Sequence, residues 1–380
     1  MDYTRRRFCR GVTAGVGFFG ILGKWILATN EASEGPGAVP AHLKEYARLY
    51  RESPMKASLQ WFRDAKFGLF VHYGLFSLGG VHPFYQFREK IPVRVYEKRA
   101  GRFTAENFDA DFICDLALAA GMKYVNLVTK HCDGFCLWDT ELTDFNSVNS
   151  AAGRDLVAEM VKACSKRGLG FFAFYEHGFD WRHPHAPRRK DFDTKLVEVN
   201  YPEPEPTYAY GDNYDLDKYL DFASDQVAEL LTNYGPIAGI WLDGIAVPLS
   251  GDRKRFRCQQ LYDRIHALQS HAMVSYKHGV TGTEDFRAPE RWQLRKIKPG
   301  DNTKPVELCE SLSPGWGYVK GAEHHDADWA WKRLAFTREK GMNYLLNIGP
   351  LGDGSVHPDD LVTLREVGQR LRKQGWPGLR

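Results

Sequence analysis

Short apolar runs alternate with helical segments along most of this chain, and this alternation restricts the fold more than any other feature. The runs have the length of strands and are apolar at successive positions, as expected of strands buried on both faces of a sheet. They cover residues 66–74, 124–129, 170–175, 237–242, 273–276, 303–309 and 342–348. Helices are expected between most of them, over residues 110–120, 154–167, 217–234, 256–271, 326–340 and 358–374. Strands that alternate with helices predict a parallel sheet, either closed into a barrel or open and doubly wound.

A barrel fits the sequence better than an open nucleotide-binding sheet, because no Gly-rich phosphate loop opens the first helix. The length of 380 residues allows two small domains or one large barrel. A hydrophobic content of 43% and an aromatic content of 13% can fill a large core. We therefore expect an α/β fold, a single and somewhat irregular (β/α)8-like TIM barrel, over residues 57–380.

The first 32 residues are expected to be a targeting segment rather than part of the fold. Arg5, Arg6 and Arg7 belong to a stretch similar to the twin-arginine export motif, and a glycine-rich apolar stretch follows. A basic amphipathic helix is the alternative. A permanent membrane span is not expected, because the apolar stretch contains many glycines and is broken by Lys24. The prediction is export by the twin-arginine pathway to a periplasmic or secreted location, with residues 33–56 forming a linker and a short helix that leads into the barrel.

The rest of the chain is almost electrically neutral. The whole sequence has 51 basic and 48 acidic residues, and the first 34 positions hold five and three of these, which leaves 46 and 45. This balance gives no reason to expect a nucleic acid or an anionic membrane as a partner. Six of the seven cysteines follow this segment without the spacing of a disulfide framework, so we expect mostly buried free thiols.

Several apolar runs end in side chains that can carry chemistry. These are His72, Lys130 with His131, Glu176 with His177, Asp243, and Lys277 with His278. In a parallel α/β barrel, active sites lie at the carboxyl ends of the strands. Asp243 and Gly244 form an Asp-Gly pair, which on its own is ordinary turn chemistry. Because so many reactive groups share this rim, we expect Asp243 to lie at the centre of a catalytic pocket.

Four motifs follow one another along the chain from about Leu59 to Gln374. They are Trp-Phe-Arg-Asp-Ala-Lys-Phe-Gly at 61–68, Lys-His-Cys-Asp-Gly-Phe at 130–135, Trp-Leu-Asp-Gly at 241–244 and Asn-Tyr-Leu-Leu-Asn-Ile-Gly-Pro at 343–350. Together they resemble glycoside hydrolase family 29, the retaining α-L-fucosidases. The family's barrel is often followed by a β-sandwich, and we expect this chain to lack one because it stops too early to hold it.

The resemblance implies a retaining exo-glycosidase that hydrolyses α-L-fucosides, or a closely related 6-deoxy sugar, by double displacement. Asp243 matches the nucleophile of the family. The stretch Asp-Phe-Arg-Ala-Pro-Glu at 285–290 is similar to an acid/base loop in part of the family, so Glu290 is the expected acid/base. Glu307 and Glu310 remain alternatives, because both lie near a strand end.

The same resemblance implies contacts to the sugar. Two histidines would bind fucose hydroxyls, two tryptophans would line the sugar's apolar face, a tyrosine would face the pocket, and a lysine stands where the family has an arginine. These residues are His72, His131, Trp241, Trp316, Tyr175 and Lys277. No cofactor or metal is implied, and the expected partner is a fucosylated glycan or oligosaccharide.

The sequence departs from the family pattern at the expected sugar site. The family usually has two histidines where this chain has His131 and Cys132, and a Glu-Trp pair where it has Pro83 and Phe84. These changes leave a second function open, a carbohydrate-binding barrel of the same fold with weak catalysis. A metallohydrolase is a third reading, suggested by His131, Cys132, Asp133 and Cys136, although the two cysteines lack a matching second half.

Overall fold

The computed structural model describes residues 38–187, 214–290 and 303–378. The expected targeting segment and its twin-arginine motif lie outside these residues. Within the described ranges, no helix combines the length and the apolar character needed to cross a membrane.

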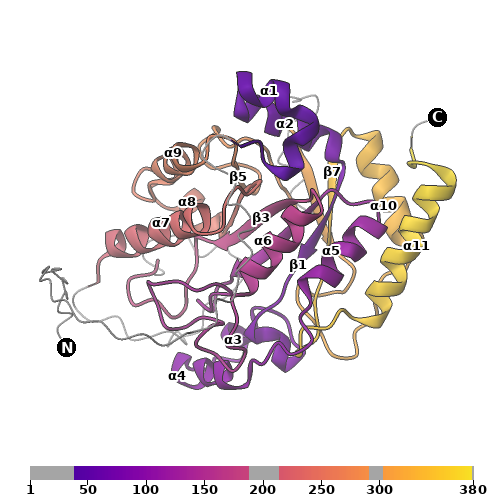
Figure 1. The fold of residues 1–380 in the computed structure, drawn as a ribbon. Helices are drawn as coiled ribbons and strands as arrows, with labels where there is room; N and C mark the ends of the chain where they lie inside the picture. The colour runs from indigo at the N-terminus through magenta and orange to yellow at the C-terminus, as the bar shows by residue number, and fades with distance from the viewer. Residues whose placement is uncertain (1–37, 188–213, 291–302, 379–380) are drawn as a thin grey trace, which may run out of the picture. The chain divides into compact units, whose positions relative to one another are not determined.

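A parallel sheet of seven strands forms the centre of the described chain (Figure 1). Its strands lie in the order β5-β4-β3-β2-β1-β7-β6, and every pair of neighbours is parallel. The strands are β1 (Phe67–Val71), β2 (Tyr124–Lys130), β3 (Gly170–Glu176), β4 (Gly239–Asp243), β5 (Met273–Tyr276), β6 (Glu307–Ser311) and β7 (Asn343–Ile348). The expected α/β class and its parallel sheet are confirmed, and the sheet curls in the manner of a TIM-like barrel.

The segment 285–290 joins the two edge strands of this sheet. On one side, the amides of Asp285 and Ala288 donate to the carbonyls of Val274 and Lys277, at and just after β5. On the other side, the segment bridges to residues 306 and 309, just before β6 and in its middle. The segment thus occupies the place between β5 and β6 and fixes Glu290 at its end.

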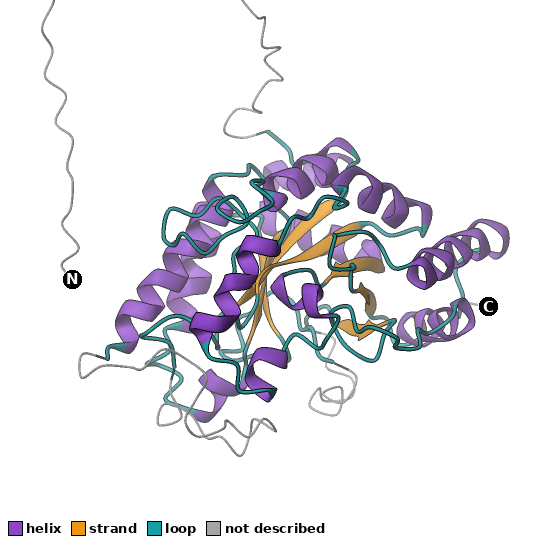
Figure 2. Ribbon diagram, turned by 90° about the horizontal axis from the view of Figure 1, so that it is seen from below, coloured by secondary structure: helices purple, strands orange, loops and turns teal. Residues whose placement is uncertain are grey.

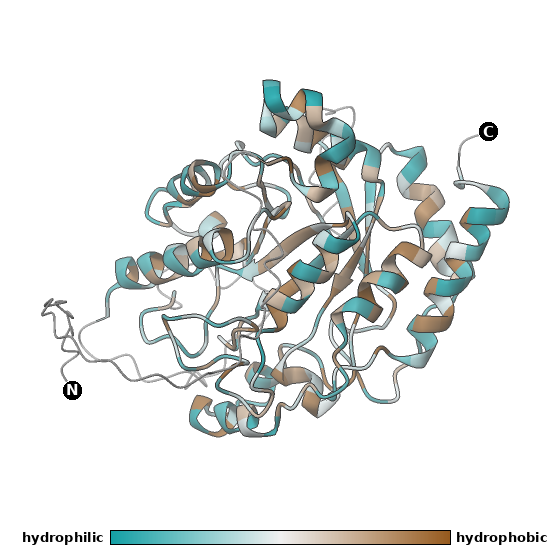
Figure 3. Ribbon diagram, in the orientation of Figure 1, coloured by the Kyte–Doolittle hydropathy of each residue, from teal (hydrophilic) through white to brown (hydrophobic). Residues whose placement is uncertain are grey.

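Helices surround the strands (Figure 2). The central strands are mostly apolar, whereas the helices carry both apolar and polar residues (Figure 3), as expected of helices with one face on the sheet. The longer ones are α2 (Pro54–Ala65), α5 (Ala110–Ala119), α6 (Leu156–Lys166), α7 (Leu216–Thr232), α9 (Cys258–Leu268), α10 (Ala327–Glu339) and α11 (Pro358–Gln374). Short helices are η1 (Ala41–Tyr46), α1 (Ala47–Glu52), η2 (Leu75–Gly79), α3 (Tyr85–Arg88), α4 (Val93–Tyr96), η3 (Glu97–Arg102) and α8 (Ala246–Ser250).

Aspartate side chains fix the start of four of these helices. Asp109, Asp155, Asp215 and Asp326 each accept a hydrogen bond from a backbone amide of the first turn of α5, α6, α7 and α10. Such a cap supplies a partner to an amide that has none within the helix. The helices therefore start within a residue or two of the positions expected from the sequence.

Two hydrophobic clusters follow from the alternation of side chains along the strands. One cluster packs the outer faces of the strands against the helices. The other fills the interior of the curled sheet, and α2 adds Trp61 and Phe62 to it. Trp61 stacks on Phe172 of β3, and Phe62 lies 4.5 Å from Phe286, centroid to centroid. The end of the interior near α2 is therefore filled with aromatic side chains.

The expected strands and long helices are all present, with shifted ends. The largest shift is at β6, which begins at Glu307 rather than at residue 303. Pro305 precedes it and has no amide to donate to a neighbouring strand. The six cysteines of the described residues are free and buried, as expected.

Candidate active site

A pocket opens at the carboxyl ends of the strands. Its volume is about 140 Å³, which is below the roughly 300–1,000 Å³ of clefts that hold drug-sized ligands. The pocket therefore suits one small ring rather than an extended chain. It is lined by Phe70, His72, Phe84, His131, Phe174, Glu176, Phe179, Asp243, Gly244, Lys277, Glu290 and Trp316.

Two carboxylates share one ammonium group in this pocket. Nζ of Lys277 lies 3.0 Å from Oδ2 of Asp243 and 2.6 Å from Oε1 of Glu290. These two oxygens are therefore no further apart than the sum of the distances, about 5.6 Å. Asp243 ends β4, and Glu290 ends the segment that joins β5 to β6. The fold thus brings both predicted catalytic carboxyls to one lysine.

Gly244 allows the chain to turn directly after Asp243. Its φ is +81°, and a Cβ at this position would meet Oε1 of Glu176 and the backbone of Gly178. The Gly244 amide donates to Oδ1 of Asp243 at 2.7 Å. Glycine is thus required here by both the backbone angle and the lack of space, and it helps to orient the carboxylate.

Burial and charge act against each other on the ionisable groups of this pocket. Burial raises the pKa of Asp243, while Lys277 acts to lower it. Burial alone would lower the pKa of Lys277, but Asp243 and Glu290 raise it above its usual value. Lys277 is therefore charged, and it favours the ionised form of Asp243.

The hydrogen bonds of Asn347 determine which nitrogen of His72 carries a proton. Nδ2 of Asn347 donates to Oγ of Ser311 and to the carbonyl of Trp316, so its Oδ1 is free to accept. That oxygen lies 2.6 Å from Nδ1 of His72, so Nδ1 donates and Nε2 is an acceptor. Burial holds the pKa of His72 well below its usual value, which keeps the ring neutral.

Aromatic rings and a second neutral histidine make up much of the remaining wall. His131 stacks on Phe174, with ring centroids 5.8 Å apart, and burial lowers its pKa to about 3. Nδ1 of His131 has no hydrogen-bond partner among the described residues. The Trp316 ring stacks on His72 at 5.2 Å. The wall therefore combines flat apolar surface with a few polar atoms, as sugar sites require.

Tyr175 and Trp241 do not line the pocket, which corrects two expectations. Tyr175 points to the helix side of β3, where its hydroxyl donates to Gln226 of α7. Trp241 lies within the interior cluster, two residues before Asp243, and donates its Nε1 to Glu307 at 3.0 Å. Lys277 lies over its ring, with Nζ 4.7 Å from the centroid. Trp241 thus supports a pocket residue from below and is not part of the lining.

The alternative acids Glu307 and Glu310 also lie away from the pocket. Glu307 accepts from Trp241 and from the Tyr124 hydroxyl within the interior, where burial raises its pKa to about 7. Glu310 accepts two hydrogen bonds from Arg333 of α10, at 2.7 and 3.0 Å. Of the three candidates for the acid/base, only Glu290 reaches the pocket.

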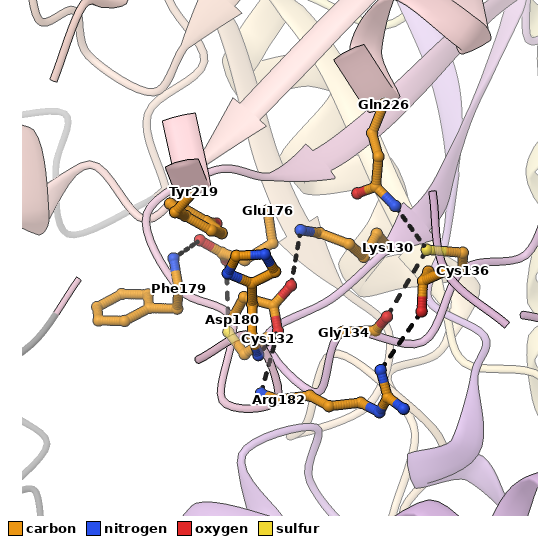
Figure 4. Close-up of polar contacts among 12 residues, drawn as sticks. Lys130, Cys132, Gly134, Cys136, Glu176, Phe179, Asp180, Arg182, Tyr219 and Gln226 are labelled. Carbon is orange, nitrogen blue, oxygen red and sulfur yellow. Dashed lines mark hydrogen bonds and ion pairs between the residues drawn. The ribbon is translucent and has the colours of Figure 1, made fainter. Parts of the chain in front are cut away.

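One carboxyl of the pocket, Glu176, was not expected there from the sequence. It ends β3 and pairs in register with Asp243 of β4. The signal was present, since Glu176 was among the polar residues at strand ends, but the resemblance assigned it no role. Cys132, which stands where the family has a second histidine, does not line the pocket, and its Sγ lies 3.5 Å from Oε2 of Glu176 (Figure 4).

The cysteines considered as metal ligands are engaged elsewhere. Cys136 contacts the Gly134 carbonyl and Nε2 of Gln226. Nearby, Lys130 pairs with Asp180 on the helix side of the sheet (Figure 4). In the described part of the chain, no group of three or more His, Cys, Asp or Glu residues is arranged to hold a metal ion. The proposed ligand set of a metallohydrolase is thus not assembled.

Comparison with known families gives one match over most of the chain. The sequence profile of the family described as Alpha-L-fucosidase matches residues 39–376. Among curated proteins, human plasma alpha-L-fucosidase is 28% identical over 355 residues, which cover 83% of this chain and 68% of that protein. An alpha-L-fucosidase of Dictyostelium discoideum is 26% identical, covering 82% of this chain and 69% of its own.

Solved structures show the same likeness. Alpha-L-fucosidase isoenzyme 1 from Paenibacillus thiaminolyticus superposes with a TM-score of 0.74 and 31% identity, over 85% of this chain and 77% of that one. An alpha-L-fucosidase from Lactobacillus casei in complex with α-L-fucose gives a TM-score of 0.73 and 26% identity, over 83% and 99% of the two chains. A mutant of the latter enzyme has been solved with Fucα(1,6)GlcNAc.

Proposed function

Because the chain belongs to the α-L-fucosidase family of glycoside hydrolases, we propose that it removes single α-L-fucosyl residues with retention of configuration. The pocket of about 140 Å³ supports the release of one sugar at a time. The proposed substrate is a fucosylated glycan or oligosaccharide. A fucose linked to N-acetylglucosamine is one such group, as in the complex of the Lactobacillus casei mutant.

The main support for a retaining mechanism is that Lys277 bonds to both Asp243 and Glu290. The carboxyls of retaining glycosidases lie about 5–5.5 Å apart, whereas those of inverting enzymes lie about 6.5–9.5 Å apart. The facing oxygens of Asp243 and Glu290 are held within about 5.6 Å by their bonds to Lys277. This spacing is closer to that of a retaining enzyme than to that of an inverting one.

Double displacement assigns one task to each carboxyl. Oδ2 or Oδ1 of Asp243 attacks the anomeric carbon, while Glu290 in its protonated form donates its proton to the departing glycosidic oxygen, so a fucosyl ester forms and the C–O bond to the aglycone breaks. Glu290, now ionised, then takes a proton from water, whose oxygen displaces Asp243 from the anomeric carbon. The products are fucose and the free aglycone, and both carboxyls return to their initial states.

The other lining residues would bind and orient the sugar. Nε2 of His72 is an acceptor for a sugar hydroxyl, since its Nδ1 donates to Asn347. His131 lines the same pocket and would contact the sugar with its ring. Trp316, Phe84 and Phe174 give an apolar wall that suits the methyl group of a 6-deoxy sugar.

The direct test is hydrolysis of 4-nitrophenyl α-L-fucoside by the purified protein. We expect D243A to lower kcat/KM by about 10³-fold or more, because the glycosyl-enzyme can no longer form. We expect E290A to lose about 10²–10⁴-fold on substrates whose leaving group needs a proton. Azide should then restore turnover of E290A on the activated aryl fucoside and give a fucosyl azide of retained configuration.

E310Q is the matched control, because Glu310 is a buried carboxyl of the neighbouring strand that bonds to Arg333 outside the pocket. It should keep the kinetics of the parent protein and gain no azide rescue. Binding of fucose without any turnover would instead identify a carbohydrate-binding barrel. A product azide of inverted configuration from E290A would contradict the assignment of Glu290.

A further inference from the structure

Glu176 is a buried carboxyl of the pocket that the two-carboxyl mechanism does not use. It is 2% exposed, lines the pocket and lies beside Asp243, its partner in the register of β3 and β4. A buried carboxyl next to the nucleophile affects both the local charge and the hydrogen bonds available to a ligand.

The contacts of Glu176 distinguish its two oxygens. Oε1 accepts from the backbone amides of Gly178 and Phe179, each at 3.1 Å; the contact with Phe179 is drawn in Figure 4. Oε2 accepts from the Cys132 thiol at 3.5 Å. Because Oε1 accepts from two backbone amides, and Oε2 only from this weaker S–H donor, a proton on this carboxyl resides on Oε2.

Asp243 and Glu176 compete for a single negative charge. Two carboxylates side by side in a buried site strongly disfavour ionisation of both. Asp243 has Lys277 at 3.0 Å and the Gly244 amide at 2.7 Å. Between described residues, no ion pair includes Glu176, which leaves Asp243 the better site for the charge.

Titratable and charged groups face Glu176 from each of the neighbouring elements. They are Asp243 on β4, Cys132 after β2, Lys130 on β2, Lys277 after β5, Tyr276 on β5, Tyr175 on β3, His177 after β3 and Tyr219 on α7. Burial, and then the charge of Asp243, raise the pKa of Glu176 well above its usual value, against smaller effects of Cys132, Lys277 and Lys130. His177 is neutral, because burial lowers its pKa to about 3.

We infer that Glu176 holds a proton on Oε2 in the resting enzyme and donates it in a hydrogen bond to the bound sugar, which makes it a further substrate-binding residue. This inference rests on the proposed function. It complements His72, which presents an acceptor, since each sugar hydroxyl is best bound by one donor and one acceptor. It also leaves Asp243 as the ionised member of the pair, the state that a nucleophile needs.

Two measurements that need no turnover test this role. Infrared difference spectra at neutral pH should show the band of a protonated carboxyl in the parent protein that is missing in E176Q. Calorimetry with L-fucose should give a Kd for E176Q within about threefold of the parent, since the amide keeps an acceptor for the two backbone amides and a donor on the other atom. The Kd of E176V, which lacks a donor, should rise by about tenfold or more.

Each contrary result has a definite meaning. Identical carboxyl bands in the parent and E176Q would show that Glu176 is ionised and would overturn the inference. So would fucose binding by E176V as tight as in the parent, or a loss of binding in E176Q while it still melts as the parent does. None of these results depends on hydrolysis. Fucose binding that depends on Glu176 without turnover would reject the proposed function and keep this inference.

Discussion

Lys277 is the residue on which the charge balance of the pocket depends. It is 4% exposed, its φ is +50°, and its ammonium group bonds to both Asp243 and Glu290. A left-handed backbone is costly for a residue other than glycine. The two ion pairs of Lys277 with Asp243 and Glu290 offset the free-energy cost of this backbone conformation. Among the described lysines, only Lys277 makes such pairs in the pocket.

Replacing Lys277 should change the pH dependence of the enzyme. Lys277 acts to lower the pKa of Asp243, so K277M should raise that pKa. Because the proposed mechanism needs Asp243 to be ionised when it attacks, activity would then be lost at a higher pH than in the parent. We expect the acidic limb of kcat/KM to move upward by about one pH unit or more, as the loss of an adjacent opposite charge implies.

K277R is the matched variant for this measurement, because it keeps the positive charge and changes only its shape. Its acidic limb should stay near that of the parent even if its kcat falls. If the acidic limb of kcat/KM lies at the same pH in K277M, K277R and the parent, that limb does not arise from the ionisation of Asp243.

The sequence predicted a place in the pocket correctly for polar side chains that directly follow an apolar strand. It failed for residues within a strand, where the face of the sheet to which the side chain points decides the outcome. Asp243 and Lys277 follow such runs directly. Tyr175 was wrongly expected in the pocket because β3 is apolar on both faces, so its sequence does not indicate which residues point inward. Once Phe174 and Glu176 face the pocket, Tyr175 must face the helices.

The segment 285–290 is the element that positions Glu290. It was not predicted as part of the sheet, because it contains a proline and pairs with its neighbours only through single bridges. The regular strands were predictable because continuous apolar runs are needed where both faces are covered. Besides its backbone hydrogen bonds to both sides, the segment is held by Phe286, which is fully buried against Phe62 of α2 and Phe172 of β3.

Truncating Phe286 should therefore affect both stability and catalysis. F286A removes a buried aromatic ring and should lower the free energy of unfolding by about 3–5 kcal/mol. It should also lower kcat by about tenfold or more, because Glu290 lies four residues further along the same segment and misplacement of about 1 Å is costly. Urea unfolding and kinetics at a temperature where the variant is folded would measure the two effects.

F62A is the matched control, because it removes the other half of the same contact from α2, at the end of the interior away from the pocket. We expect F62A to lose about as much stability as F286A but to keep the kcat of the parent protein. Equal losses of kcat in both variants would show that the interior packing, and not the segment, controls activity.

Across the described chain, burial of neutral histidines links stability to pH. Burial lowers the pKa of His42, His131 and His177 to about 3, whereas an unfolded histidine titrates near 6.5. Below that pH the unfolded chain binds protons that the folded chain does not, so stability falls as the pH falls. Buried acids such as Asp133 and Glu307, whose pKa values rise to about 6 and 7, act in the opposite direction.

The contribution of His42 to this pH dependence can be measured separately from catalysis. Its ring packs on Trp61, with centroids 4.6 Å apart, at the end of the interior away from the pocket. In the parent, each pH unit below 6.5 should cost about 1.4 kcal/mol at this residue until the pH nears 3. The loss of stability between pH 8 and pH 4.5 should therefore be smaller in H42F by about 3 kcal/mol.

Urea unfolding of both proteins at the two pH values measures this difference, and the packing cost of the substitution cancels between them. A difference that does not change with pH would show that His42 titrates normally in the folded protein. None of this could be read from the sequence, since it depends on which histidines are buried without a charged partner.

The aromatic filling contributed by α2 has a consequence for the order of events in each cycle. Among the described residues, these side chains fill the interior below the pocket, so in the proposed reaction ligands would enter and leave past the carboxyl ends of the strands. The aglycone would lie nearer that opening and leave first, and water would then reach the glycosyl-enzyme by the same route. Free fucose would leave last.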